Sequence, residues 1–256
     1  MSTIGLGIDV GGSGIKGATV DLASGELTAE RLRIETPQPS TPDAVAGVIA
    51  EVAKHFSGEL AKDGAIGVTM PSVVTQGVVR TAANIDKSWI GADADAMFTE
   101  RLGRAVHVVN DADAAGIAEA RFGAARSTKG LVVVTTLGTG IGTALLFNGQ
   151  LIPNSELGHL EVDGHDAETR AASSARENED LSWQQWAERL QRYYSAIEDL
   201  LWPALIVVGG GVSKKADKFL PLLHLRAPIV AAQLRNEAGI IGAAVLAEED
   251  AAALKK

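Results

Sequence analysis

The sequence contains no cysteine and few aromatic residues, which make up 4% of its 256 residues. Without cysteine, disulfides and all metal sites built on thiolates are excluded. The chain has no apolar run of about 18 residues, the length that spans a membrane, and no charged or apolar leader. We therefore expect a cytoplasmic protein that is neither secreted nor inserted in a membrane. Positive charge is also scarce, and the net charge of −9 argues against general binding to nucleic acid.

Hydrophobic residues make up 46% of the chain and charged residues 21%, which is typical of a globular protein with a sizeable core. The length fits one large domain or two small ones. Thr41 and Pro42 predict the start of a helix with apolar residues through Phe56. Ser182 and Gln185 predict a capping box for a long helix, whose aromatic stripe favours core or a subunit interface over a ligand platform. The other expected elements are helices over 96–102 and 237–247, extended segments over 26–34, 66–70 and 73–79, and a buried strand over 205–208.

A glycine-rich segment follows the first apolar run, Ile4 to Val10. Its glycines 12, 14 and 17 match the GxGxxG string of dinucleotide-binding folds, but that fingerprint needs a helix to follow. Here the Ser24-Gly25 turn lies between two extended runs, so the pattern predicts a tight turn inside a strand hairpin. Glycines in such a turn let backbone N–H groups approach phosphate oxygens, although a purely structural β-turn would have the same pattern.

The polar residues of this turn suit phosphate chemistry. Asp9 at its mouth can hold a water-bound Mg²⁺, and Lys16 can meet phosphate charge. The candidate phosphate-binding residues here are Asp9, Gly11, Gly12, Ser13, Gly14 and Lys16.

Asn110 and Asp111 stand where an apolar strand, 106–109, ends and a helix of small residues begins. Glycine-rich turns lie before and after them in the sequence. A carboxylate at such a junction is what phosphoryl transfer to a hydroxyl requires, and Asp111 is the candidate catalytic base. The alternative is that Asp111 merely caps the helix and favours its positive end.

The second half of the chain repeats the first. Residues 130–136 predict a strand, Gly138 to Gly142 a glycine-rich turn, and Asn148-Gly149 a hairpin turn. This order mirrors residues 4–25 and suggests two related halves, each with a phosphate loop. The candidate phosphate-binding residues of the second loop are Gly138, Thr139 and Gly140.

Residues 155–168 are dense with polar side chains. Glu156, His159 and Glu168 suit a hydrogen-bonding pocket for a polyol, because carboxylates accept from paired hydroxyls and imidazole can donate or accept. A metal site is the alternative, since four residues would share one face of a strand. Those four are His159, Glu161, Asp163 and His165.

A basic segment follows the glycines that end the 205–208 strand. Its lysines can be the solvated start of a helix, or they can give an acidic protein a local attractive field for a polyanion. The candidate donor-binding residues are Gly209, Gly210, Gly211, Lys214, Lys215 and Lys218.

Together these motifs resemble the ROK family of sugar kinases, within the actin/hexokinase-like superfamily, over nearly the whole chain. Residues 81–89 and 209–217 are similar to the polyphosphate glucokinase and glucomannokinase branch. The resemblance implies an α/β fold of two lobes with ribonuclease-H-like sheets. The N-terminal lobe would comprise residues 1–110 plus 236–256, and the C-terminal lobe residues 111–235. The last helix would pack back onto the N-terminal lobe.

The resemblance also implies a function and a site. Asp111 would accept the proton of the 6-hydroxyl of glucose, with Mg²⁺ present and polyphosphate or ATP as donor, in a homodimer. Mannose is a possible second sugar. The sugar would bind in a cleft between the lobes, to Asn84, Asn110, Asp111, Glu156, His159 and Glu168. The alternatives are a strictly ATP-dependent ROK hexokinase and a non-enzymatic sugar sensor on the same fold.

One departure from the family concerns zinc. Many ROK members place a cysteine-rich zinc loop between the positions of His159 and Glu168, where this chain has only residues 160–167. Since it also lacks cysteine, we expect no zinc, and His159 would be free to contact the sugar directly.

Overall fold

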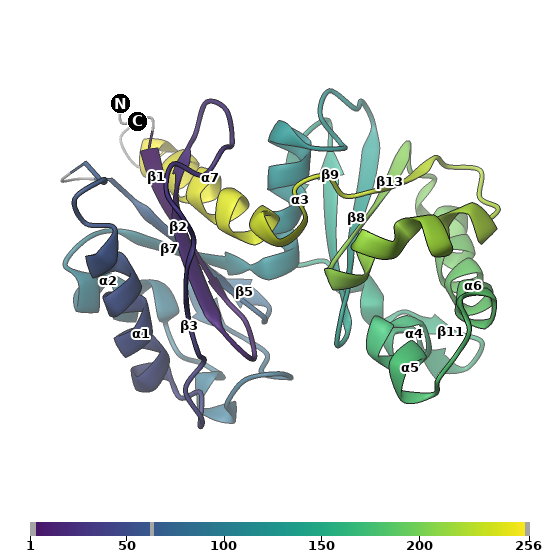
Figure 1. Ribbon diagram of the computed structural model, residues 1–256, viewed down its shortest axis with the longest axis horizontal. Coiled ribbons are helices and arrows are strands. Elements are labelled where there is room, and N and C mark those ends of the chain that lie inside the picture. Colours follow the sequence, from purple (N-terminus) through teal and green to yellow (C-terminus); the bar gives the residue numbers. More distant parts are fainter. Residues whose placement is uncertain (1–3, 62–63, 254–256) are drawn as a thin grey trace. The chain divides into compact units, whose positions relative to one another are not determined.

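Figure 1 shows a computed structural model, which describes residues 4–61 and 64–253. Contacts divide the chain into two compact units. The first unit holds the residues up to Ala118 and those from Glu237 onward, and the second unit holds Glu119–Asn236. The division falls inside helix α3 (Asp111–Phe122), whereas the sequence placed a lobe boundary after residue 110. Among the described residues, every helix is too short or too polar to cross a membrane.

The first unit contains a five-stranded sheet in the order β3-β2-β1-β4-β7. Strands β1, β2 and β3 are antiparallel neighbours, while β4 and β7 run parallel to β1. The carboxyl ends of the three parallel strands therefore share one edge of the sheet. Their bounds are β1 (Ile4–Val10), β2 (Ile15–Asp21), β3 (Leu32–Ile34), β4 (Ile66–Met70) and β7 (Val106–Asn110).

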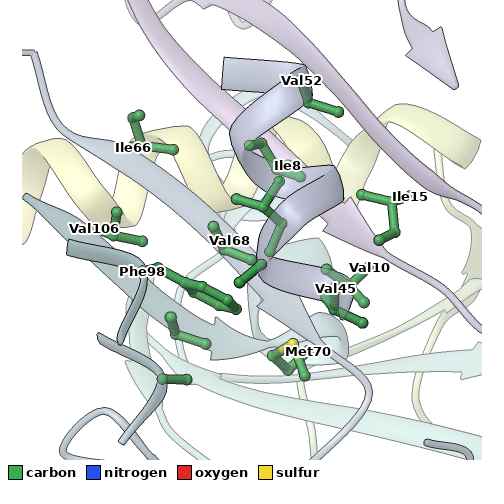
Figure 2. Close-up of a cluster of buried hydrophobic side chains, with 14 of the residues drawn as sticks. Ile8, Val10, Ile15, Val45, Val52, Ile66, Val68, Met70, Phe98 and Val106 are labelled. Carbon is green, nitrogen blue, oxygen red and sulfur yellow. The ribbon is translucent and has the colours of Figure 1, made fainter. Parts of the chain in front are cut away.

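Helices α1 (Pro42–His55) and α2 (Ala94–Leu102) pack on one face of this sheet. Alternate residues of β1, such as Leu6 and Ile8, point to that face and are fully buried. Figure 2 shows part of this core, where Val45 and Val52 of α1 pack with strand residues such as Ile8 and Val68.

The last helix, α7 (Ala238–Ala253), packs on the opposite face, against β1 and β4 (Figure 1). This packing has almost no space for side chains, because a Cβ at Gly7 would overlap the carbonyl of Ile240, and one at Gly67 would overlap that of Ala243. Gly242 of α7 meets the backbone of Ala114 in α3 just as closely. The glycines thus let helix and sheet backbones touch, and the last helix packs within the first unit.

The second unit repeats this topology with a five-stranded sheet in the order β10-β9-β8-β13-β14. Strands β8, β9 and β10 are antiparallel neighbours, and β13 and β14 are parallel to β8, so the predicted internal repeat is confirmed. Its core includes the aromatic stripe of α6 (Trp183–Leu201), in which Trp186 and Tyr194 are buried. The strand bounds are β8 (Leu131–Leu137), β9 (Ile141–Phe147), β10 (Gln150–Ile152), β13 (Leu205–Gly209) and β14 (Ile229–Ala231).

Four elements differ from their predicted bounds. Segment 73–79 is a hairpin of β5 (Val74–Thr75) and β6 (Val78–Val79), because Gln76 and Gly77 adopt positive φ. Only Leu32–Ile34 of segment 26–34 forms a strand. Helix α2 starts at Ala94 because the Asp93 carboxylate caps it, and α7 continues to Ala253.

The remaining elements are short and connect the larger ones. They are β11 (Glu161–Val162), β12 (His165–Asp166), α4 (Ala167–Ala171), α5 (Ser173–Asn178), and the 3-10 helices η1 (Lys87–Trp89), η2 (Leu157–His159), η3 (Gly211–Lys218), η4 (Leu220–Leu222) and η5 (Arg235–Glu237).

The contact between α7 and the sheet predicts a strong effect of one added methyl group. Gly67→Ala places a Cβ on the Ala243 carbonyl and should lower the free energy of unfolding by about 3 kcal/mol. Gly47→Ala is the control, because this position lies in α1 with its nearest neighbour 3.9 Å away, and alanine should stabilise the helix by about 0.5–1 kcal/mol. Urea unfolding measures both, and a parent-like midpoint for Gly67→Ala would contradict the packing.

Candidate active site

The first glycine turn joins β1 to β2 and is held by side chains from elsewhere. Inside the turn, the Gly11 N–H donates to the Gly14 carbonyl at 3.1 Å. From outside, Thr36 Oγ1 donates to the Gly11 carbonyl at 2.5 Å, and Arg33 Nη2 donates to the Ser13 carbonyl at 2.9 Å. The guanidinium packs so tightly that a Cβ on Gly14 would lie 2.7 Å from Arg33 Nε. The sequence alone did not single out Arg33 or Thr36, because only the pairing of β2 with β3 brings them here.

Strand register places Asp9 between two partners. Asp9 pairs with Lys16 across β1 and β2, and with Thr69 across β1 and β4. Accordingly, Asp9 Oδ1 accepts from Thr69 Oγ1 at 2.9 Å, and Asp9 Oδ2 lies 3.4 Å from Lys16 Nζ. Both charged side chains remain partly exposed, 21% for Asp9 and 28% for Lys16, so they are accessible to a ligand. Thr69 was not predicted as a site residue.

Asn110 and Asp111 have different roles at the start of α3. Asn110 Oδ1 accepts from the N–H groups of Ala112 and Asp113, at 2.8 and 3.0 Å, so Asn110 is the helix cap. Its amide donates to the Ser72 carbonyl at 3.1 Å, which ties the cap to the loop after β4. Asp111 is the first helical residue, and its Oδ1 also accepts from Ala112 N–H at 2.8 Å. The capping role considered for Asp111 therefore falls mainly on its neighbour.

Asn84 lies on an exposed loop near the first glycine turn, since a Cβ on Gly12 would lie 4.0 Å from the Asn84 carbonyl. The loop is anchored by Trp89, whose Nε1 donates to the Ser40 carbonyl at 2.8 Å. Trp89 is fully buried and packs edge-on against Phe98. It therefore belongs to the hydrophobic core of the first unit.

The second glycine turn is held from below by a carboxylate. The Gly138 N–H donates to the Gly140 carbonyl at 3.0 Å, and the Ile141 N–H donates to Glu168 Oε2 at 3.1 Å. A Cβ on Gly140 would overlap that carboxylate oxygen, so a larger residue there would displace the Glu168 side chain. Ser174, which was not predicted, donates its hydroxyl to the Thr139 carbonyl at 2.6 Å.

Three predicted sugar ligands of the second unit lie together, with Glu156 and Glu168 on either side of the His159 ring. Its Nε2 lies 3.8 Å from Glu156 Oε2, and its Nδ1 lies 4.0 Å from Glu168 Oε1. A fourth residue, Asp166, places Oδ2 2.8 Å from Nδ1. This hydrogen bond, followed by the nearby carboxylates, raises the pKa of His159, whereas burial raises the pKa of Glu156. Sequence reasoning missed Asp166, and its place seven residues after His159 gave no signal.

The four-residue metal site is wrong, because its residues do not lie on one strand. They fall on η2 and on the β11–β12 hairpin, whose tip is Asp163-Gly164 with φ of 53° and 78°. Asp163 instead pairs with Arg192, with Oδ1 2.7 Å from Nη2 and Oδ2 3.0 Å from Nε.

A pocket of about 270 Å³ opens at the carboxyl end of β8, beside the second glycine turn. Gly210, at φ 81°, turns the chain there, where a Cβ would overlap the backbone of Leu137. The pocket is lined by Gly138, Thr139, Ser173, Ser174, Arg176, Glu177, Trp183, Gly211, Val212 and Lys215, together with Leu137.

Two cations of this pocket lie over one aromatic ring. The Arg176 guanidinium carbon is 3.8 Å and Lys215 Nζ 5.9 Å from the centre of the Trp183 ring. Arg176 Nε is buried without a hydrogen-bond partner. Of the other predicted lysines, Lys214 is exposed beside Lys215, and Lys218 pairs with Asp217 at 3.3 Å.

The sequence model of the ROK family matches residues 5–171. The chain belongs to the ROK family. It is 56% identical over 247 residues to the polyphosphate glucokinase of Mycobacterium tuberculosis (strain CDC 1551 / Oshkosh), a match that covers 96% of this chain and 92% of that protein.

Two solved ROK structures agree in fold. The inorganic polyphosphate/ATP-glucomannokinase of Arthrobacter sp. strain KM superposes with a TM-score of 0.93 at 55% identity, covering 97% of this chain and 100% of that one. A ROK glucokinase of Streptomyces griseus, in complex with glucose and AMPPNP, gives a TM-score of 0.82 at 25% identity, covering 96% and 99%. The expected actin/hexokinase-like α/β fold is thus confirmed.

The cap at α3 can be tested apart from catalysis. Asn110→Ala removes the cap and the bond to Ser72, whereas Asn110→Ser removes only the latter and keeps a good capping hydroxyl. The free energy of unfolding of the alanine variant should therefore be about 1 kcal/mol lower than that of the serine variant. Chemical denaturation measures this difference, and equal stability of the two variants would show that Asn110 is not the cap.

Proposed function

We propose that this ROK protein is a glucokinase that transfers a phosphoryl group from inorganic polyphosphate or ATP to the 6-hydroxyl of glucose. Its likeness over nearly the whole chain to a polyphosphate glucokinase and to a polyphosphate/ATP-glucomannokinase carries the proposal. The second relative's name makes mannose the other sugar to test. The homodimer and the cytoplasmic location implied by the family resemblance belong to the same proposal, and sedimentation equilibrium measures the dimer directly.

In this proposal both glycine turns bind phosphate. Asp9, Gly11, Gly12, Ser13, Gly14 and Lys16 act in the first unit, and Gly138, Thr139 and Gly140 in the second. Support comes from the rigid hydrogen bonds that hold each turn and from the accessible Lys16 ammonium.

Asp9 fits Mg²⁺, because one carboxylate, with water and phosphate oxygens completing the shell, is the donor set that this ion prefers. The Thr69 hydroxyl orients that carboxylate. When bound, Mg²⁺ neutralises charge on the transferred phosphoryl group.

The sugar ligands are Asn84, Asn110, Asp111, Glu156, His159 and Glu168. Their support is chemical, since carboxylates and an imidazole accept and donate to paired hydroxyls. Asp111 accepts the proton of the 6-hydroxyl and directs that oxygen toward the phosphoryl group. Because the transition state of phosphoryl transfer is loose, this positioning matters more than basicity.

Polyphosphate is the preferred donor in this proposal, and ATP is also accepted. The pocket beside the second turn offers the cations of Arg176 and Lys215, and Gly211 lines it, while Gly209 and Gly210 lead the chain from β13 into the pocket wall. Lys214 and Lys218 extend the positive charge along η3. Lysine suits a sliding polymer, because it binds phosphate as a point charge without a fixed bidentate geometry.

A coupled glucose 6-phosphate assay with Mg²⁺ and either donor tests the function. The parent should form product with both donors. Asp111→Asn should lower kcat by about 1000-fold, because an amide neither takes the proton nor directs the hydroxyl oxygen as the carboxylate does, while calorimetry shows nearly unchanged glucose affinity. Product with ATP alone would leave a strictly ATP-dependent hexokinase. No product from the parent would favour the sugar sensor, and full turnover by the variant would remove Asp111 from its role.

The donor assignment predicts selective effects of charge. Replacing Lys214, Lys215 and Lys218 by glutamate should raise KM for long polyphosphate by about tenfold, and KM for ATP by less than about threefold. Added salt should weaken polyphosphate use in the same selective way. Lys129→Glu is the control, because this exposed lysine precedes the other end of β8, about 20 Å along the strand. Equal kinetics of the triple variant and the parent would mean that the polymer takes another route.

A further inference from the structure

His159 is held by a protein carboxylate where the resemblance to ROK proteins would place a zinc loop. His159, Asp166 and Glu168 each offer one donor atom, and these atoms lie within 4.8 Å of one another. However, His159 Nδ1 and Asp166 Oδ2 are already joined at 2.8 Å. Two ligands of tetrahedral zinc, each about 2.0–2.2 Å from the ion, would lie about 3.3 Å apart. With Glu168 Oε2 also engaged by Ile141 N–H, these residues do not fit a zinc ion.

The carboxylate that holds the ring is itself fixed. Asp166 is the cap of α4, and its Oδ1 accepts from the Glu168 N–H at 3.2 Å. Its backbone carbonyl accepts from Thr169 Oγ1 at 2.7 Å, and its strand pairs with Glu161 of β11. One oxygen of Asp166 therefore anchors the helix, while the other is directed at the imidazole.

We propose that Asp166 is a positioning residue, which orients the His159 ring for glucose and so replaces the zinc loop found in many ROK proteins. This inference rests on the proposed function. With Nδ1 donating to Asp166, Nε2 faces Glu156 and is left for a sugar hydroxyl. Nε2 accepts from the sugar when the ring is neutral and donates when the ring is protonated.

Three carboxylates face this ring, from Glu156, Asp166 and Glu168. All three raise the pKa of His159, and the hydrogen bond to Asp166 contributes most. Removing that bond should therefore lower the pKa of the ring.

The alternative is that Asp166 only caps α4, and serine separates the two roles. Asp166→Ser keeps a good capping hydroxyl but is too short to hold the imidazole. Asp166→Asn keeps the cap through its single amide oxygen, and its NH2 group still reaches Nδ1, to which it can donate when the ring is neutral. A purely structural role predicts parent-like behaviour for both variants. A positioning role predicts that only the serine variant releases the ring.

The experiment measures glucose and donor kinetics, glucose binding by calorimetry, and the pKa of His159 by NMR. For Asp166→Ser we expect KM and Kd for glucose about tenfold higher, because the ring is no longer held in its binding geometry. We expect a lower His159 pKa, and a kcat and donor KM within about threefold of the parent. Asp166→Asn should raise the glucose KM much less than Asp166→Ser. Treating the parent with a zinc-selective chelator should leave its glucose Kd unchanged.

Parent-like glucose affinity and His159 pKa in Asp166→Ser would overturn the proposal, as would an equal rise in the glucose and donor KM values. Zinc-dependent glucose binding by the parent would overturn it as well. Failure of the proposed function looks different, because the parent itself would form no glucose 6-phosphate. The glucose Kd and the His159 pKa would still report on Asp166 in that case.

Discussion

The backbone contact between α7 and its neighbours is the constraint on which the first unit depends. Glycine at positions 7, 67 and 242 allows this helix to touch β1, β4 and α3 without intervening side chains. These are the elements that carry Asp9, Thr69 and Asp111. At the start of α7, a Cβ on Gly239 would lie 3.1 Å from Asp9 Oδ1, so the same helix also borders the candidate Mg²⁺ ligand. A helix from the end of the chain thereby helps to set the distances between these three residues from its first half.

The two glycine turns are stabilised in the same way, by side-chain donors to their carbonyls, but the donor residues differ. A tight turn whose amide groups are to meet an anion needs its carbonyls satisfied from elsewhere. Arg33 and Thr36 supply those donors in the first unit, and Ser174 does so in the second. The repeated topology therefore preserves the shape of the turn, while the supporting side chains are particular to each half.

Much of the fold and part of the candidate site could be predicted from sequence. Glycine spacing, hairpin turns and helix caps are local signals, and they identified the repeated strand–turn–strand units and the residues Asp9, Asp111, His159 and Glu168. Asp166, Arg33 and Thr69 could not be found in this way, because strand register or chain reversal brings them to the site. The prediction of a metal site on one face of a strand was wrong for a related reason. Alternation was assumed across 159–165, where Asp163 and Gly164 in fact reverse the chain.

Glu168 connects two parts of the second unit that the sequence treated separately. One carboxylate oxygen accepts from Ile141 N–H at the end of the second glycine turn, and the other faces His159 among the candidate sugar ligands. If a ligand bound at the turn shifts this carboxylate and so changes the affinity for a ligand at His159, the second ligand must change the affinity for the first by the same factor, because linkage between two binding events is reciprocal. A single side chain thus gives the second glycine turn and the surroundings of His159 a direct route by which a ligand bound at one can change the affinity for a ligand at the other.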